Sequence, residues 1–299
     1  MTEDRRGTLL GIAAYLMWGS FPLYWPLLEP AGALEILAHR VVWSLVAVMV
    51  LLLATGRSLR GLPRERRPLL LLVAAAVLIG VNWGVYIWGV NNGHVLETSL
   101  GYFINPLVSV ALAVVVLGEK LRPVQWLAVA VAAGGVIVLT VVAGRPPWIA
   151  LALAFSFGTY GLVKKIVGVA AVEGLVVETA VLAPVAFAFL VVVVATGGSH
   201  FTNHGAAHAL LLTTTGAVTV APLLAFAGAA SRVPLNRLGL MFYMTPTIQF
   251  LIGVLLRHEP VSSGRLAGFV IVWLALALFT VDTATTRRRQ LDLAAEAVT

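Results

Sequence analysis

The sequence predicts an all-α membrane protein with ten transmembrane helices, arranged as two inverted five-helix repeats. Three observations support this fold class: ten apolar runs of membrane-spanning length, basic residues gathered on one side of those runs, and a second half that echoes the first. The composition agrees, because 60% of the 299 residues are hydrophobic and only 11% are charged, against about 25% in soluble domains. A water-soluble enzyme and a disordered chain are both disfavoured.

The apolar runs are the first evidence, since crossing the ~30 Å hydrocarbon core takes about 20 residues of helix. In chain order they cover 8–27, 35–54, 69–90, 97–117, 123–143, 148–164, 174–195, 208–230, 238–256 and 264–282. The run at 148–164 is the shortest, and the boundary near Pro222 is the least defined. A signal peptide is the weaker interpretation of the first run, because no small-residue cleavage site follows it.

The breaks between runs are short and hold most of the charged residues. They read, in order, EPAGALE, GRSLRGLPRERRP, NNGHVLE, GEKLRP, GRPP, KKIVG, TGGSHFTNHG, SRVPLNR and RHEPVSSGR around the nine junctions. None is long enough for a folded soluble domain.

Basic residues predict the orientation. With the amino terminus in the cytoplasm, the inner segments hold sixteen of the twenty Lys and Arg residues, including Arg57, Arg60 and Arg64, and the outer ends hold three. This asymmetry predicts a multi-pass protein of the cell (inner or plasma) membrane with both termini cytoplasmic. Because the bases separate apolar runs, they are interpreted as topology signals, and no nucleic-acid partner is expected.

An internal repeat is the third observation. VLETSLGYFINPLVSVALAVVVLGE at 95–119 matches LNRLGLMFYMTPTIQFLIGVLLRHE at 235–259, and Trp18-Gly19-Ser20-Phe21 matches Phe157-Gly158-Thr159-Tyr160 at nearly the same offset. The predicted units are 1–145 and 146–284, two five-helix halves, and 285–299, a cytoplasmic tail. An odd number of spans per half makes the halves inverted, which is typical of secondary transporters. Chance similarity between Ala-, Val- and Leu-rich helices is the alternative.

Polar groups within hydrocarbon are functional candidates, because they are costly unless they face the bundle interior. Arg40 is the strongest, and two roles stay open for it: binding substrate, or pinning neighbouring carbonyls and loop ends. The predicted substrate-cavity residues are Tyr15, Trp18, Arg40, Asn82, Tyr86, Tyr102, Asn105, Phe157, Tyr243 and Thr245. Aromatic rings with a few amides suit an uncharged or zwitterionic, partly apolar solute.

Two prolines at equivalent positions, Pro106 and Pro246, are predicted hinges, because each frees a backbone carbonyl one turn earlier. Packing kinks are the alternative interpretation. Glycines predicted to allow close helix contact are Gly19, Gly80, Gly84, Gly89, Gly134 and Gly135.

The residues that several kinds of catalysis or metal binding require are absent from the sequence. There is no cysteine, no His-Glu-x-x-His run and no Walker-type phosphate loop, so thiol catalysis, a membrane zinc protease and an ATP-driven pump are disfavoured. No metal site and no cofactor are expected. Acidic residues such as Glu35, Glu97 and Glu178 lie at or near span ends, so a carboxylate proton relay has no obvious residue.

The strings YLMWGSFPLYW, EILAHRVVWS, LIGVNWGVYIWGVNN, SLGYFINPL, LGEKLRPVQWLAV and AFSFGTYGLVKK resemble the RarD group of the EamA-type drug/metabolite transporter superfamily. The resemblance implies a ten-helix inner-membrane permease with two inverted halves. The resemblance also implies that the family's helix-end glutamate motif falls on Glu119 and, in the second half, on Glu259. The match at Glu259 is weaker, because the chain reads RHEP there. These two residues are predicted to have gating or structural roles.

The sequence thus predicts a permease or exporter, and no enzyme. We expect it to move small organic solutes, such as amino-acid-like metabolites or drugs, by alternating access. A membrane-embedded enzyme or a transporter-like sensor is the alternative. The expected partners are a small-molecule substrate and the lipid bilayer.

Overall fold

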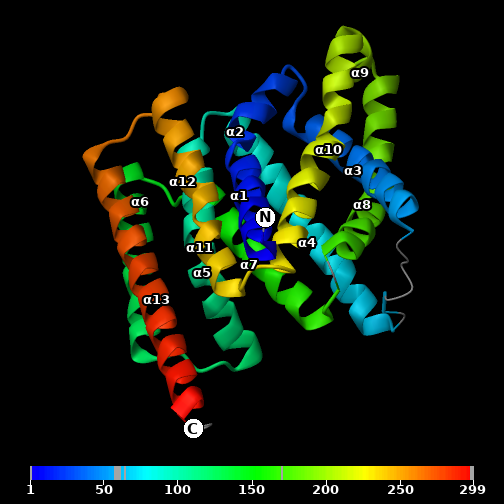
Figure 1. The fold of residues 1–299 in the computed structure, drawn as a ribbon. Coiled ribbons are helices and arrows are strands. Elements are labelled where there is room, and N and C mark those ends of the chain that lie inside the picture. The colour runs from blue at the N-terminus through cyan, green and yellow to red at the C-terminus, as the bar shows by residue number, and fades with distance from the viewer. Residues whose placement is uncertain (1, 57–61, 64, 170, 297–299) are drawn as a thin grey trace.

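The computed structural model describes residues 2–56, 62–63, 65–169 and 171–296, and every regular element in those ranges is a helix (Figure 1). The predicted all-α class is therefore confirmed. The long helices are α1 (Glu3–Gly19), α3 (Ala33–Thr55), α4 (Arg66–Asn91), α5 (Val95–Leu117), α6 (Pro123–Ala143), α7 (Trp148–Val167), α8 (Ala171–Ala195), α10 (Gly205–Ala230) and α13 (Ser263–Glu296). Arg57, Arg60 and Arg64 of the orientation argument lie outside the described residues.

Within the described ranges, nine helical segments are long and apolar enough to cross a membrane. The predicted count of ten is not confirmed, because the first run forms a broken segment: α1 has 17 residues and is followed by the short helices α2 (Phe21–Tyr24) and η1 (Trp25–Leu28). Pro22 and Pro26 explain the breaks, since each lacks the N–H that would continue the preceding helix and suits the first turn of a new one.

The two matched prolines have different local structures. Pro106 lies inside the unbroken helix α5. Pro246 lies near the start of α12 (Met244–Leu251), which is separated from α11 (Leu235–Phe242) at Tyr243 and continues into η3 (Ile252–Leu256). The run predicted at 238–256 is thus three short helices in succession. Pro246 cannot donate to the Phe242 carbonyl one turn earlier, which fits the break at Tyr243.

The helix ends lie at two opposite faces of the bundle. We call the end that carries α2 and α9 (His200–Asn203) the α9 face, and the end where α13 terminates the C-terminal face (Figure 1). α6 and α13 pack along each other at one side. The other principal helix contacts are α3–α8, α5–α12, α1–α10, α4–α7, α1–α12, α5–α7, α3–α10 and α4–α8.

Glycines set the closest of these approaches. A Cβ atom added at Gly216 of α10 would overlap the backbone carbonyl of Trp43 in α3. Gly135 would meet Val272 of α13 at 2.9 Å, whereas a Cβ at Gly134 has no neighbour within 4 Å. The predicted close contact at Gly134 is therefore wrong, because the adjacent Gly135 occupies the side of α6 that is turned to α13.

We predict that Gly216→Ala destabilises the bundle by about 1–3 kcal/mol, because two backbones must separate to admit one methyl group. Gly134→Ala is the matched control, and it should be neutral or stabilising by up to about 1 kcal/mol, since alanine is the better helix former. Unfolding of the two purified variants in increasing denaturant measures the difference. Equal stability of both would contradict this account of the α3–α10 contact.

Candidate solute-binding cavity

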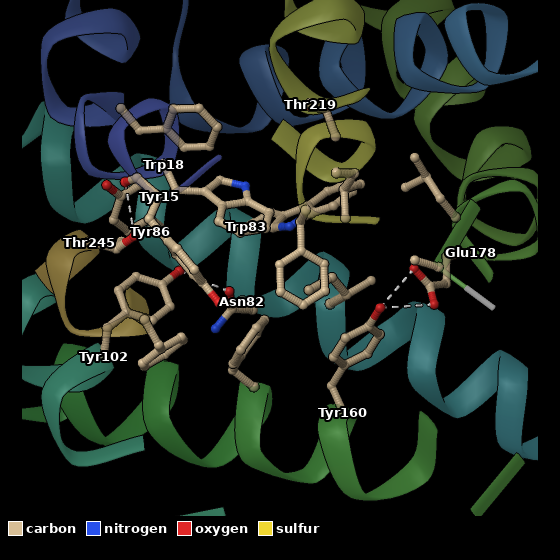
Figure 2. Close-up of a pocket in the computed structure, with 18 of the residues that line it drawn as sticks. Tyr15, Trp18, Asn82, Trp83, Tyr86, Tyr102, Tyr160, Glu178, Thr219 and Thr245 are labelled. Atoms are coloured by element: carbon tan, nitrogen blue, oxygen red, sulfur yellow. Dashed lines mark hydrogen bonds between the residues drawn. The ribbon is translucent and has the colours of Figure 1, made fainter. Parts of the chain in front are cut away.

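A cavity of about 380 Å³ lies at the centre of the bundle, within the range of about 300–1,000 Å³ usual for small-molecule sites (Figure 2). Residues from both halves of the chain line it, and most are aromatic or aliphatic. Eight of the ten predicted cavity residues are in this lining: Tyr15, Trp18, Arg40, Asn82, Tyr86, Tyr102, Phe157 and Thr245.

Arg40 is buried, with 4% of its surface exposed. Its guanidinium carbon lies 4.0 Å from the ring centre of Trp83, 4.9 Å from that of Trp25 and 5.8 Å from that of Phe21. The Nε atom donates a hydrogen bond to Thr219 Oγ1 at 3.0 Å. Trp43, three residues after Arg40 on the same helix, is not among these rings, and its indole N–H donates to His39.

Asn82 fixes two helices to each other. Its side-chain NH₂ donates to the Leu153 carbonyl at 3.1 Å and to Ser156 Oγ at 3.0 Å, both on α7, and its Oδ1 accepts from the Tyr102 hydroxyl at 3.2 Å. Because these bonds use both ends of the amide, Asn82 shapes the cavity wall and has little hydrogen-bonding capacity left for a solute.

Side chains of α12 hold α1 through backbone carbonyls. Thr245 Oγ1 donates to the Tyr15 carbonyl at 3.1 Å, and Gln249 Nε2 donates to the Trp18 carbonyl at 3.3 Å. Two buried atoms of lining residues have no hydrogen-bond partner among the described residues, Gln249 Oε1 and the Tyr86 hydroxyl. Both atoms are covered by neighbouring protein atoms, so they are unsatisfied polar groups within the cavity wall.

The other two predicted cavity residues lie elsewhere. Tyr243 lines a separate hollow with Phe103 and Trp273, and its hydroxyl is 3.4 Å from Thr280 Oγ1. Asn105 is buried against α7, where its Oδ1 lies 3.4 Å from the position of a Cβ at Gly158. Both belong to helix segments that turn these side chains away from the central cavity.

Sequence reasoning missed an ion pair in the lining. Lys164 Nζ of α7 lies 2.9 Å from Glu178 Oε1 of α8, and the Tyr160 hydroxyl donates to both carboxylate oxygens at 3.1 and 3.3 Å (Figure 2). Glu178 is buried although it lies only seven residues after the start of α8. The lining extends to the ends of α7 and α8 nearest the C-terminal face, so residues near span ends reach the cavity.

At the α9 face, glutamates join the two halves by accepting hydrogen bonds from helix-starting N–H groups. Glu259 accepts from Val95 and Leu96 at the start of α5, at 2.5 and 3.0 Å. Glu97 accepts from Ile149 near the start of α7 at 2.9 Å. Such N–H groups have no partner within their own helix and favour negative charge.

Glu35 makes the third link, accepting from the His200 N–H at 2.8 Å and lying 2.7 Å from His200 Nδ1. We call Glu35, Glu97 and Glu259 the carboxylate clamps. Burial raises the pKa of the Glu259 carboxyl above its usual value, although the two backbone N–H groups favour the charged form.

The C-terminal face is joined differently. Glu119, the repeat counterpart of Glu259, lies 2.9 Å from Lys165 Nζ, and both side chains are at least half exposed. Arg237 contacts Asp4 at 2.8 Å on the surface as well. Exposed ion pairs contribute only about 0–1 kcal/mol each. The ion pairs between the halves at this face are thus mostly exposed, apart from the partly buried Arg122–Asp282 pair between α6 and α13.

His200, His204 and His208 stack at the α9 face, with ring centres 4.9 and 5.6 Å apart along the series. His208 Nε2 lies 3.0 Å from the Leu28 carbonyl. Over the described residues, no group of three or more His, Asp or Glu side chains has the arrangement of a metal site. These histidines serve helix and loop contacts.

Known proteins resemble this chain along nearly its whole length. Residues 5–141 match the EamA-like transporter family. The chain is 55% identical to Protein RarD of Streptomyces exfoliatus, over 96% of this chain and 92% of the relative. It is 44% identical to Protein RarD of Escherichia coli strain K12, over 96% and 98%. It is 43% identical to the uncharacterized transporter YojE of Bacillus subtilis, over 96% and 97%.

A crystal structure of a protein with 17% sequence identity shares the fold, with a TM-score of 0.61 over 92% of this chain and 97% of the other. With nine apolar helices in the described ranges, these matches indicate a multi-pass membrane protein related to transporters. The chain belongs to the RarD group of the EamA-like transporter family.

Proposed function

We propose that the protein is a secondary transporter that moves small organic solutes across the cell membrane by alternating access. The observation that carries the proposal is the central cavity, which both halves of the chain enclose and whose lining extends to the C-terminal-face ends of α7 and α8. The α9 face is closed by the carboxylate clamps, while the lining extends to the C-terminal-face ends of α7 and α8. This arrangement fits one end state of a carrier.

The helix contacts support two inverted five-helix halves. The offset of about 140 residues relates α1, α3, α4, α5 and α6 to α7, α8, α10, α11–α12 and α13. If each helix is replaced by its counterpart in the other half, the α1–α10 contact becomes α7–α4, a contact that the structure also has. In the same way, α1–α12 becomes α7–α5 and α3–α10 becomes α8–α4, and both of these contacts are present. The contacts α3–α8, α5–α12 and α6–α13 map onto themselves. We therefore count α1 through η1 as a tenth span.

The charge asymmetry gives the proposed orientation. The C-terminal face carries the helix ends that hold Arg66, Lys120, Lys164 and Lys165, so it is assigned to the cytoplasm with both termini. The cavity then faces the cytoplasm in this state, and the clamps seal the opposite side. The proposed partners are the bilayer and a small-molecule solute.

Glu119 and Glu259 are the proposed gate pair. Glu259 caps α5, and Glu119 occupies the matching position after α5, from which it would cap α11 if the C-terminal face closed. In the described state it pairs with Lys165 on the surface instead. Inverted halves require that a contact made at one face be released at the other.

Pro106 and Pro246 remain the proposed hinges. Ser99 Oγ of α5 donates to the Pro246 carbonyl of α12 at 2.7 Å, so the two helices meet beside one of the prolines. The unbroken and broken helices around the two residues suit opposite ends of one motion.

The gate pair predicts which face of the protein opens when one of its glutamates is removed. Because the chain has no cysteine, a single Thr245→Cys substitution in the cavity reports the opening through its labelling. Glu259→Ala should raise labelling of that cysteine by an impermeant thiol reagent from the α9 face by about tenfold, because ~1.4 kcal/mol of lost capping shifts a population ratio that far. Glu119→Ala is the matched control and should not raise it. If Glu119→Ala raises α9-face labelling as much, the two residues do not act on opposite faces.

A disulfide that can be formed and reduced across the α9 face tests transport itself. Leu96 Cγ lies 3.2 Å from the position of a Cβ at Gly253, so a Leu96→Cys/Gly253→Cys pair can form a disulfide across the closed α9 face. Liposomes containing this variant are loaded with a small-metabolite extract of bacterial cells, and mass spectrometry identifies what leaves.

We expect particular solutes to leave unchanged when the pair is reduced and to be retained when it is oxidised. New masses in place of lost solutes would indicate an enzyme. Release that is absent in the reduced state, or unaffected by oxidation, would contradict alternating access.

A further inference from the structure

Three charged side chains line the cavity: two are cations, Arg40 and Lys164, and one is an anion, Glu178. Lys164 and Glu178 lie 2.9 Å apart and neutralise each other, with the Tyr160 hydroxyl completing the carboxylate's contacts. Arg40 has no carboxylate within ion-pairing distance among the described residues. Glu35, little more than one turn earlier on the same helix, is occupied by His200. The cavity wall therefore carries a net positive charge.

The contacts of Arg40 leave its hydrogen-bonding edge free. A guanidinium has five N–H donors, and the one recorded bond from Arg40 is Nε to Thr219 Oγ1. The rings of Trp83, Trp25 and Phe21 pack around the group and stabilise the charge by cation–π attraction, but they accept none of the remaining N–H bonds.

A purely structural role does not account for this geometry. An arginine that organises a bundle donates to neighbouring carbonyls or carboxylates, and Arg40 donates to neither in the described part of the chain. Leaving a buried charge unpaired costs several kcal/mol. A ligand that supplied a negative group would remove that cost, and the cavity gives it room.

We propose that Arg40 binds the carboxylate of the transported solute, and that the solutes are organic monoanions with an apolar or aromatic body. This inference rests on the transport function proposed above and names its substrate class. A carboxylate matches the planar guanidinium edge in two parallel hydrogen bonds. Trp18, Phe157 and Phe226 line the cavity for the apolar body.

The proposal is tested by binding, without a membrane gradient. The purified protein in lipid nanodiscs is titrated calorimetrically with 3-phenylpropionate, with its neutral amide 3-phenylpropanamide, and with the cation phenethylamine. We expect the carboxylate to bind at least tenfold more tightly than either of the others. Absence of millimolar binding by the carboxylate, or equal binding of the amide or amine, would overturn the proposal without any variant.

Variants then assign the preference to one residue. Arg40→Gln should abolish the preference for carboxylate over amide, and Arg40→Lys should retain part of it, since charge remains but the two-bond geometry is lost. Arg265→Gln is the control, because that arginine lies at the α9-face end of α13 and bonds the Pro260 carbonyl outside the cavity. A preference that survives in Arg40→Gln would refute the assignment.

The binding result separates this inference from the proposed function. Selective carboxylate binding together with no solute release from the liposomes would retain Arg40 as an anion site and reject transport. Release of intact neutral or cationic solutes, with no carboxylate preference, would retain transport and reject the monoanion class.

Discussion

Hydrogen bonds from helix-starting N–H groups to buried or partly buried glutamates at the α9 face are the constraint on which the described state depends. Glu35, Glu97 and Glu259 each join one half of the chain to the other. A carboxylate bonded to unpaired N–H groups satisfies the helix end and its dipole together, so it fixes the position of one half against the other. At the C-terminal face ion pairs join the halves instead: exposed pairs, which give way to water at little cost, and the partly buried Arg122–Asp282 pair.

The contacts at the two faces determine on which side the central cavity is sealed. Apolar helices in a bilayer gain little from hydrophobic association, so packing and a few polar contacts decide where halves meet and part. Asn82, Thr245 and Gln249 tie neighbouring helices around the cavity, and their polar groups are largely used in doing so. Arg40 differs, because its charge is stabilised by rings while most of its donors are free.

The sequence alone was sufficient for the helical class and for most span positions, because hydropathy over about 20 residues is a local property. It also directed attention to Arg40, since a charge in an apolar run is conspicuous. The Lys164–Glu178 pair was missed because each residue lies near a span end, and only the tertiary arrangement of α7 and α8, which both pack on α4, brings them to the cavity. The helix around Pro106 is unbroken while the one at Pro246 is broken at Tyr243, although the two residues match in the repeat, so the repeat alignment alone does not predict the local structure.

Distances between the halves, measured at both faces by pulsed electron spin resonance, test the central claim most directly. Spin labels at Asn92 and Thr196 report the α9 face, and labels at Lys120 and Ile166 report the C-terminal face; all four residues are exposed. The account predicts two distance populations at each face, and Glu259→Ala should lengthen the first pair while shortening the second. A single unchanged distance at each face, or changes of the same sign at both, would contradict it.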